Sequence, residues 1–180
     1  MADLLERSAQ AYQELIPFRY HFTLGHKGEL RHISLHFPEV AYYHLAGLHR
    51  VGIAALSNKK KALEVILLKR VTHEHIIGAG VALEDRWMRI CRLKEMIEVN
   101  RIIFCYRGHE QPGSMIQADY LMVHEGFALF MAGETPASIF EQRARRYEKG
   151  CPRFVTLKIE REDKLTGRKM NLFMSPNFKR

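Results

Sequence analysis

The order of its predicted elements places this chain in the α+β class, with N-terminal helices and a β-hairpin packed with a four- to five-stranded antiparallel sheet. Two observations favour this class. Helical spacing of apolar residues dominates the first half of the chain, as in residues 4–16 and 84–98. From residue 101 onward the pattern alternates as in β-strands, with short turns between the strands. Helices first and strands later are typical of an antiparallel sheet rather than of repeated βαβ units.

The first elements are a helix, a hairpin and a second helix. Residues 4–16 carry apolar side chains at helical spacing up to Pro17, and residues 18–24 and 30–37 are predicted strands joined by a turn at 25–28. Pro38 suits the first turn of a helix. In that helix His44 lies one position from the apolar stripe, so we expect it at the edge of a cleft.

The later elements follow from periodicity and turn residues. We expect helices over residues 59–70, with Asn58 as N-cap, and over 84–98, whose arginines lie mostly away from its apolar face. A short helix is predicted over residues 137–147. The expected strands are residues 101–106, 115–124, 127–132, 153–160 and 168–174.

Composition limits the protein class. The 180 residues, 47% of them hydrophobic, are enough for one core, so we expect a single domain over 1–180. No apolar run of membrane-spanning length and no basic leader are visible, and the three cysteines are widely spaced, so we expect a cytoplasmic protein without membrane contact. A net charge of +8 favours an anionic partner, most commonly nucleic acid.

Several kinds of chemistry lack their sequence signals. We find no Gly-x-Gly-x-x-Gly, no Walker lysine and no Gly-x-Ser-x-Gly. His73 and His75 would share one side of a strand, but no third ligand stands at a familiar spacing. We therefore predict neither a cofactor nor a bound metal.

Metal-independent cleavage of RNA is the kind of chemistry that the sequence still allows, because it needs only proton-transfer groups and cations that stabilise the phosphate. The candidate side chains can each also be interpreted structurally: His44 as a hydrogen-bonded core histidine, Ser138 as a capping residue, Tyr147 as a core residue and Lys158 as the polar face of an edge strand. The candidate catalytic residues are His44, Arg89, Ser138, Tyr147 and Lys158.

The chain also resembles a known family. An aromatic residue followed by His44-Leu45-Ala46-Gly47-Leu48 is similar to an element of the phage group of nuclease-like proteins, which are related in fold to barnase, EndoU, the tRNA-cleaving colicins and RelE. The likeness continues through residues 85–93, 118–121 and 137–147 and ends at the strand of Lys158. The resemblance implies helices packed on an antiparallel sheet and a metal-independent endoribonuclease. It matches His44, Arg89, Ser138 and Tyr147 to family positions.

The resulting prediction is a toxin-like RNase that acts on tRNA or mRNA by 2′-hydroxyl attack. His44 is the acid or base, Arg89 and Lys158 stabilise the phosphate charge, and Tyr147 or Ser138 positions it. A separate inhibitor protein is a possible partner. Two alternatives stay open: a non-catalytic nucleic-acid-binding accessory protein of phage or mobile-element origin, and a basic docking surface for an acidic protein.

Overall fold

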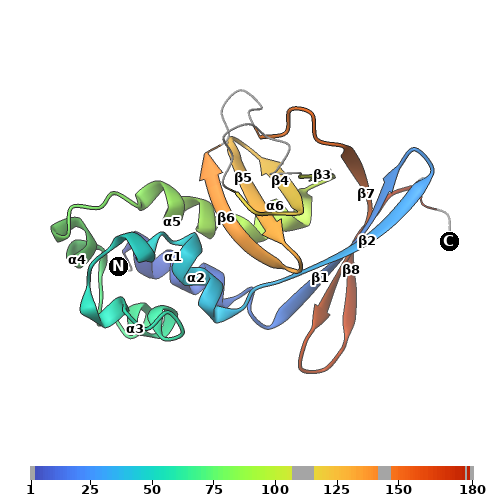
Figure 1. The fold of residues 1–180 in the computed structure, drawn as a ribbon. Helices are drawn as coiled ribbons and strands as arrows, with labels where there is room; N and C mark the ends of the chain where they lie inside the picture. The colour runs from blue at the N-terminus through green and yellow to red at the C-terminus, as the bar shows by residue number, and fades with distance from the viewer. Residues whose placement is uncertain (1–2, 107–115, 142–146, 177, 179–180) are drawn as a thin grey trace. The chain divides into compact units, whose positions relative to one another are not determined.

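The computed structural model describes residues 3–106, 116–141, 147–176 and 178 of the chain (Figure 1). It is an α+β structure with an antiparallel sheet, which confirms the predicted class. The chain divides into two compact units. Unit 1 comprises residues 1–16 and 37–94, and unit 2 comprises residues 17–36 and 95–180. The single domain over 1–180 stays a prediction.

Unit 1 is helical and its core is aromatic. Asp3 caps the first helix by accepting a hydrogen bond from the Glu6 amide at 2.8 Å. The Tyr42 hydroxyl lies 2.8 Å from Ser8 Oγ, and the Tyr12 hydroxyl donates to the Pro38 carbonyl. Burial raises the pKa of both tyrosines, so both stay neutral. The helices are α1 (Leu4–Gln13), α2 (Glu39–Leu45), α3 (Ala62–Leu67), α4 (His73–Gly78) and α5 (Glu84–Cys91), with 3-10 turns η1 (Leu48–Arg50) and η2 (Ala54–Leu56).

Two predicted helices differ from those observed. The helix expected over 84–98 is two helices, α5 and α6 (Leu93–Val99), separated at Arg92. The helix expected over 59–70 is shorter, because residues 59–61 form a turn and α3 begins at Ala62. Three successive lysines in the first turn would oppose the helix dipole, which accounts for the later start.

Unit 2 contains the sheet, which has eight strands within the described residues rather than four or five. Its order is β2-β1-β7-β3-β4-β5-β6, with β8 paired to β7, and every pairing is antiparallel. The β1–β2 hairpin therefore lies beside the β7–β8 hairpin (Figure 1). The strands are β1 (Phe18–His26), β2 (Glu29–His36), β3 (Ile102–Cys105), β4 (Tyr120–His124), β5 (Phe127–Ala132), β6 (Thr135–Glu141), β7 (Arg153–Asp163) and β8 (Lys169–Met174).

The strand β1 has one apolar and one polar face. Tyr20, Phe22 and Leu24 are buried, whereas His21 and Thr23 alternate with them on the other face. Directly opposite residues share a face, so the register of β2 and β7 extends this polar face across three strands. The fold thus gathers polar side chains from residues that lie far apart in the sequence.

The helix predicted over residues 137–147 is wrong where the structure describes it. Residues 135–141 form β6, in which Ile139 lies opposite Leu129 and Ser138 opposite Phe130. Strand β5 is almost entirely buried and needs a partner on this edge, and that pairing overrides the local helical pattern. Residues 142–146 of this predicted helix lie outside the described residues, as does Met115 at the start of the strand expected over 115–124.

Within the described part of the chain, no helix combines the length and apolar character needed to cross a membrane.

Candidate functional site

His44 lies at the C-terminal end of α2, where its side chain is exposed. Its ring is 5.4 Å from that of Tyr43 and 5.4 Å from that of His49. Leu45 and Leu48, which follow it, are fully buried and anchor this segment. His44 is therefore an accessible imidazole on a fixed backbone and not a core histidine.

The backbone conformation and close packing of Gly47 explain why the motif around His44 contains a glycine. Its φ is +76°, a conformation that side chains other than glycine rarely adopt. A Cβ atom would also lie 2.7 Å from Leu83 Cδ2 and 3.1 Å from Arg86 Cδ. The missing side chain lets α5 approach the end of α2, and the Trp87 indole and Arg86 then donate to the carbonyls of Ala46 and Leu45 at 3.1 and 3.4 Å.

The surroundings of His44 are strongly basic. Burial lowers the pKa of His49, and the neighbouring basic groups His44, Arg86 and Arg50 lower it further. The pKa of Arg86 is also lowered by burial and then by Arg50 and Arg89. We call His44, His49, Arg50, Arg86 and Arg89 the basic cluster. Its mutual repulsion favours an anion such as a phosphate group.

Arg89 belongs to this cluster, so the structure places two of the five predicted site residues in one part of unit 1. Its guanidinium is mostly buried and lies 3.7 Å from Asp85 one turn earlier on α5. An i,i+4 pair of this kind restrains the arginine without neutralising the whole cluster.

Ser138 and Tyr147 lie elsewhere, in unit 2, beside an apolar group of side chains. Ser138 is opposite Phe130 in the β5–β6 ladder, and the Tyr147 ring is 5.2 Å from that of Phe130. Phe140 lies 6.2 Å from the same tyrosine ring. Both residues therefore have the surroundings expected of packing residues.

Lys158 is on β7, opposite Thr23 of β1, and its Nζ lies 2.7 Å from Glu160 Oε1. It shares the polar face described above. The five predicted residues therefore lie in two units. His44 and Arg89 belong to unit 1, and the other three belong to unit 2, where Lys158 is on the polar face and Ser138 and Tyr147 are beside the apolar group.

The polar face holds a hydrogen-bonded series that the sequence reasoning did not single out. His21 Nε2 lies 2.6 Å from Glu162 Oε2, and His21 Nδ1 lies 3.0 Å from Ser34 Oγ. Because a carboxylate only accepts, neutral His21 carries its proton on Nε2, and Nδ1 accepts from the Ser34 hydroxyl. The hydrogen bond from His21 lowers the pKa of Glu162, which keeps that carboxylate charged.

A second imidazole lies beside the first. His32 Nδ1 is 3.3 Å from Thr23 Oγ1, and Lys169 Nζ is 3.7 Å from Glu162. These side chains, except that of Glu162, line a polar pocket of about 430 Å³, which we call the His21 pocket. Its lining residues are His21, Phe22, Thr23, His32, Ile33, Ser34, Tyr120, Gly133, Glu134, Glu160 and Lys169.

The comparison with protein families decides the affiliation of the chain. The model of the family described as phage-Barnase-EndoU-ColicinE5/D-RelE like nuclease4 matches residues 4–174. The chain belongs to this family of nuclease-like domains. It has no significant match among curated proteins or among solved structures.

Membership of the nuclease family confirms the resemblance drawn from the residues around His44 and extends it over nearly the whole chain. It supports a nucleic acid as the substrate class and a phage-related nuclease as the general activity. The residues that act within this nuclease fold have to be argued from the geometry.

A signal for the His21 pocket was present in the sequence of this nuclease-like chain. His21 and Thr23 occupy the polar positions of one predicted strand, and His32 and Ser34 those of the next. The hairpin turn would have set their register. The remaining partners could not be found in this way, because they are distant in sequence; the contact of His21 with Glu162, for example, joins residues 141 positions apart.

His73 and His75 do not share a strand as assumed, because they lie on α4. His73 Nε2 is 3.0 Å from Glu84 Oε1, and His75 Nδ1 accepts a hydrogen bond from the Thr72 amide at 3.1 Å. Both imidazoles therefore organise the start of a helix.

Proposed function

We propose that the protein is a metal-independent endoribonuclease that cleaves RNA by 2′-hydroxyl attack, with the reaction in the His21 pocket. The observation that carries the proposal is the pair of imidazoles, His21 and His32, on adjacent strands of one open polar pocket. Each is hydrogen-bonded to a hydroxyl group, and His21 is also held by Glu162. Two proton-transfer groups and nearby cations meet the needs of this reaction without a metal.

The proposed step balances as follows. A neutral imidazole takes the proton of the 2′-hydroxyl, and the 2′-oxygen attacks the phosphorus. The bond from phosphorus to the 5′-oxygen breaks, and the second imidazole, in its protonated form, gives a proton to that leaving oxygen. Lys158 and Lys169 stabilise the additional phosphate charge. The products are a 2′,3′-cyclic phosphate and a free 5′-hydroxyl.

We assign the basic cluster to binding of the RNA backbone. His44 and Arg89 then contribute affinity through phosphate contacts. The sequence-based prediction gives His44 the proton transfer itself and Ser138 or Tyr147 the positioning of the phosphate. That assignment remains the competing one, and variants separate the two.

The biological setting is also a proposal. We propose tRNA or mRNA in the cytoplasm as the substrate, a toxin-like role, and an inhibitor protein that restrains the enzyme. Free thiols at the three cysteines are in keeping with a reducing compartment.

A second candidate function is nucleic-acid binding without cleavage. The observation that favours it is that His21 and His32 already have hydrogen-bond partners, as in a structural ladder of polar side chains across strands. In that case the basic cluster would bind phosphate and no bond would break.

The test is incubation of the purified protein with labelled tRNA and mRNA in excess chelator, beside folded His21→Asn and His32→Asn variants. We expect cleavage by the wild type with cyclic-phosphate ends, and a loss of about 10²–10⁴-fold in each variant. Intact RNA with every protein, together with salt-sensitive binding, would refute the enzyme and support the binding protein.

A further inference from the structure

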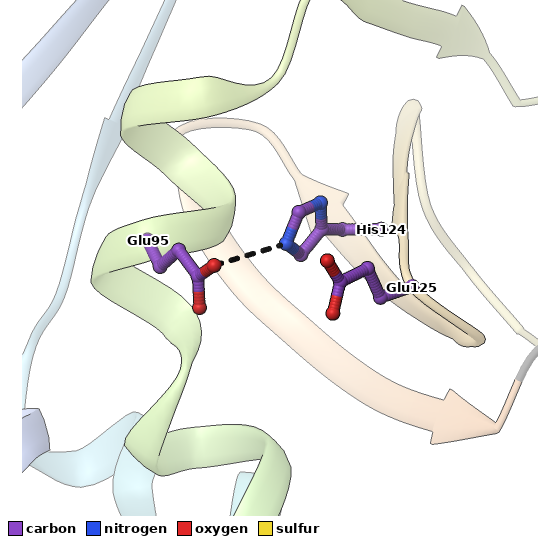
Figure 2. Close-up of side chains that lie close together, drawn as sticks. All are labelled: Glu95, His124 and Glu125. Atoms are coloured by element: carbon purple, nitrogen blue, oxygen red, sulfur yellow. Dashed lines mark ion pairs between the residues drawn. The ribbon is translucent and has the colours of Figure 1, made fainter.

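A cluster of possible metal ligands lies in unit 2, apart from the His21 pocket and the basic cluster. Glu95 belongs to α6, whereas His124 ends β4 and Glu125 begins the turn into β5. Figure 2 shows the His124 and Glu125 side chains directed toward Glu95. One imidazole nitrogen and two carboxylate oxygens lie within 4.8 Å of one another. Among the residues that the structure describes, no other group of three ligands is as close.

The imidazole nitrogen is the decisive atom. His124 Nε2 is shielded from solvent and makes no hydrogen bond. Glu95 Oε1 lies 3.8 Å away, near enough for an ion pair but too far for a hydrogen bond. A buried ring nitrogen without a hydrogen bond is costly unless some group satisfies it, and a metal ion placed between the two side chains would do so.

The backbone holds these side chains in place. The His124 ring makes an edge contact with Phe127, at 5.9 Å between centroids. Glu125 and Gly126 both have positive φ, 38° and 84°, which closes a two-residue hairpin turn. On the facing side Asn100, at the end of α6, donates to the Val123 carbonyl at 3.1 Å. The helix and the turn are thus already joined beside the cluster.

We propose that Glu95, His124 and Glu125 bind one divalent transition-metal ion that joins α6 to the β4–β5 turn. One nitrogen and two carboxylate oxygens suit Zn²⁺, Co²⁺ or Mn²⁺. Ligands about 2.1 Å from a shared ion lie roughly 3.4 Å apart at a tetrahedral angle, so rotation of the two exposed glutamates closes the site. Water completes the coordination. The ion stabilises this part of unit 2 and takes no part in RNA cleavage.

Cobalt is the probe, because its visible absorption reports the ligand type and geometry. The chelator-treated full-length protein is titrated with Co²⁺, and thermal unfolding is followed with Co²⁺ and with Zn²⁺. We expect one ion per chain, ligand-field bands without thiolate charge transfer, and a Tm rise of about 5–10 °C at a hundredfold excess over Kd. The absence of a thiolate band excludes Cys91, Cys105 and Cys151 as ligands.

The variants are Glu95→Gln, His124→Asn and Glu125→Gln, with His73→Asn as the matched control. His73 also lies beside a glutamate, at 3.0 Å from Glu84, but forms no group of three ligands with the residues that the structure describes. We expect each site variant to weaken Co²⁺ binding by about tenfold or more and the control to bind like the wild type. The two glutamates are exposed, so their variants keep the test valid if His124→Asn fails to fold.

The proposal is overturned if the wild type shows neither the bands nor the Tm rise, or if any site variant responds like the wild type. Cleavage in excess chelator is measured separately, so a failure of the metal site and a failure of the proposed nuclease are distinguishable.

Discussion

The basic cluster of unit 1 and the His21 pocket of unit 2 both contain histidines, but their charged groups are arranged differently. In the basic cluster, positive groups lie close together and lower each other's pKa, as at His49 and Arg86. In the pocket, cations and carboxylates are paired and the imidazoles have hydrogen-bond partners. The first arrangement favours an anionic ligand, and the second can orient a proton. This difference is the basis on which we propose that RNA binding and proton transfer belong to different parts of the chain.

After the substitution of His21 or His32 itself, the largest effect is expected at the residue that holds His21. Glu162→Gln replaces the carboxylate that holds the His21 ring at Nε2, and we expect kcat for RNA cleavage to fall about 10²-fold with KM little changed. Glu160→Gln is the comparison, because Glu160 lines the same pocket but its side chain pairs with Lys158 and not with His21, and we expect a smaller loss there. Equal losses in both variants would mean that the overall charge of the pocket matters and not the orientation of His21.

Gly47→Ala tests how the basic cluster is built. The positive φ and the 2.7 Å approach of Leu83 both oppose a Cβ atom, and we expect a loss of about 2–4 kcal/mol in the free energy of unfolding. Gly80→Ala is the control, because Gly80 has a φ of +73° but open space around it, so we expect about 1 kcal/mol there. Urea denaturation measures both. Equal losses would show that backbone conformation alone requires the glycine.

Arg50→Gln tests whether the basic cluster binds the RNA backbone. We expect the Kd for RNA to rise about three- to tenfold and the dependence of log K on log salt to become shallower by about one. Arg168→Gln removes an exposed charge in unit 2 and serves as the control. If the control weakens binding as much, attraction is a property of the net charge and not of the cluster.

The smallest effect is the pH dependence of stability. Burial lowers the pKa of His36 and His49 in the folded protein, so the unfolded chain binds more protons between the folded value and about 6.5. Stability should rise with pH through this interval and level off on either side of it. Each histidine contributes at most about 1.4 kcal/mol per pH unit, and less where solvent screens it. Urea denaturation at several pH values should show a shallower slope in His49→Asn.

Local sequence predicted the early elements well. Turn residues and the alternation of apolar with polar side chains are signals that span only a few positions. They were enough to predict the turn around residues 25–28, the strands on either side of it and the helix that ends before Pro17. The helix expected over residues 137–147 was wrong because pairing with the buried β5 decided the structure. The break at Arg92 also went unpredicted, because helical periodicity continues across it.

The site was predictable only in part. His44 and Arg89 could be chosen, because a glycine-containing motif and a basic helix face are local features, and the structure brings both into one cluster. The His21 pocket depends on a contact between β1 and β7, whose partners lie more than a hundred residues apart. The metal cluster likewise joins a helix to a distant turn. Side chains that meet through tertiary pairing leave little trace in periodicity.

The most direct test of the division between binding and proton transfer is single-turnover cleavage of a labelled RNA at saturating protein, with Kd measured alongside, for His21→Asn and His44→Asn. We predict that His21→Asn loses the cleavage rate and keeps its Kd, whereas His44→Asn weakens binding and cleaves normally once saturated. A normal rate in His21→Asn, with cleavage lost in His44→Asn, would contradict this account and place proton transfer at His44.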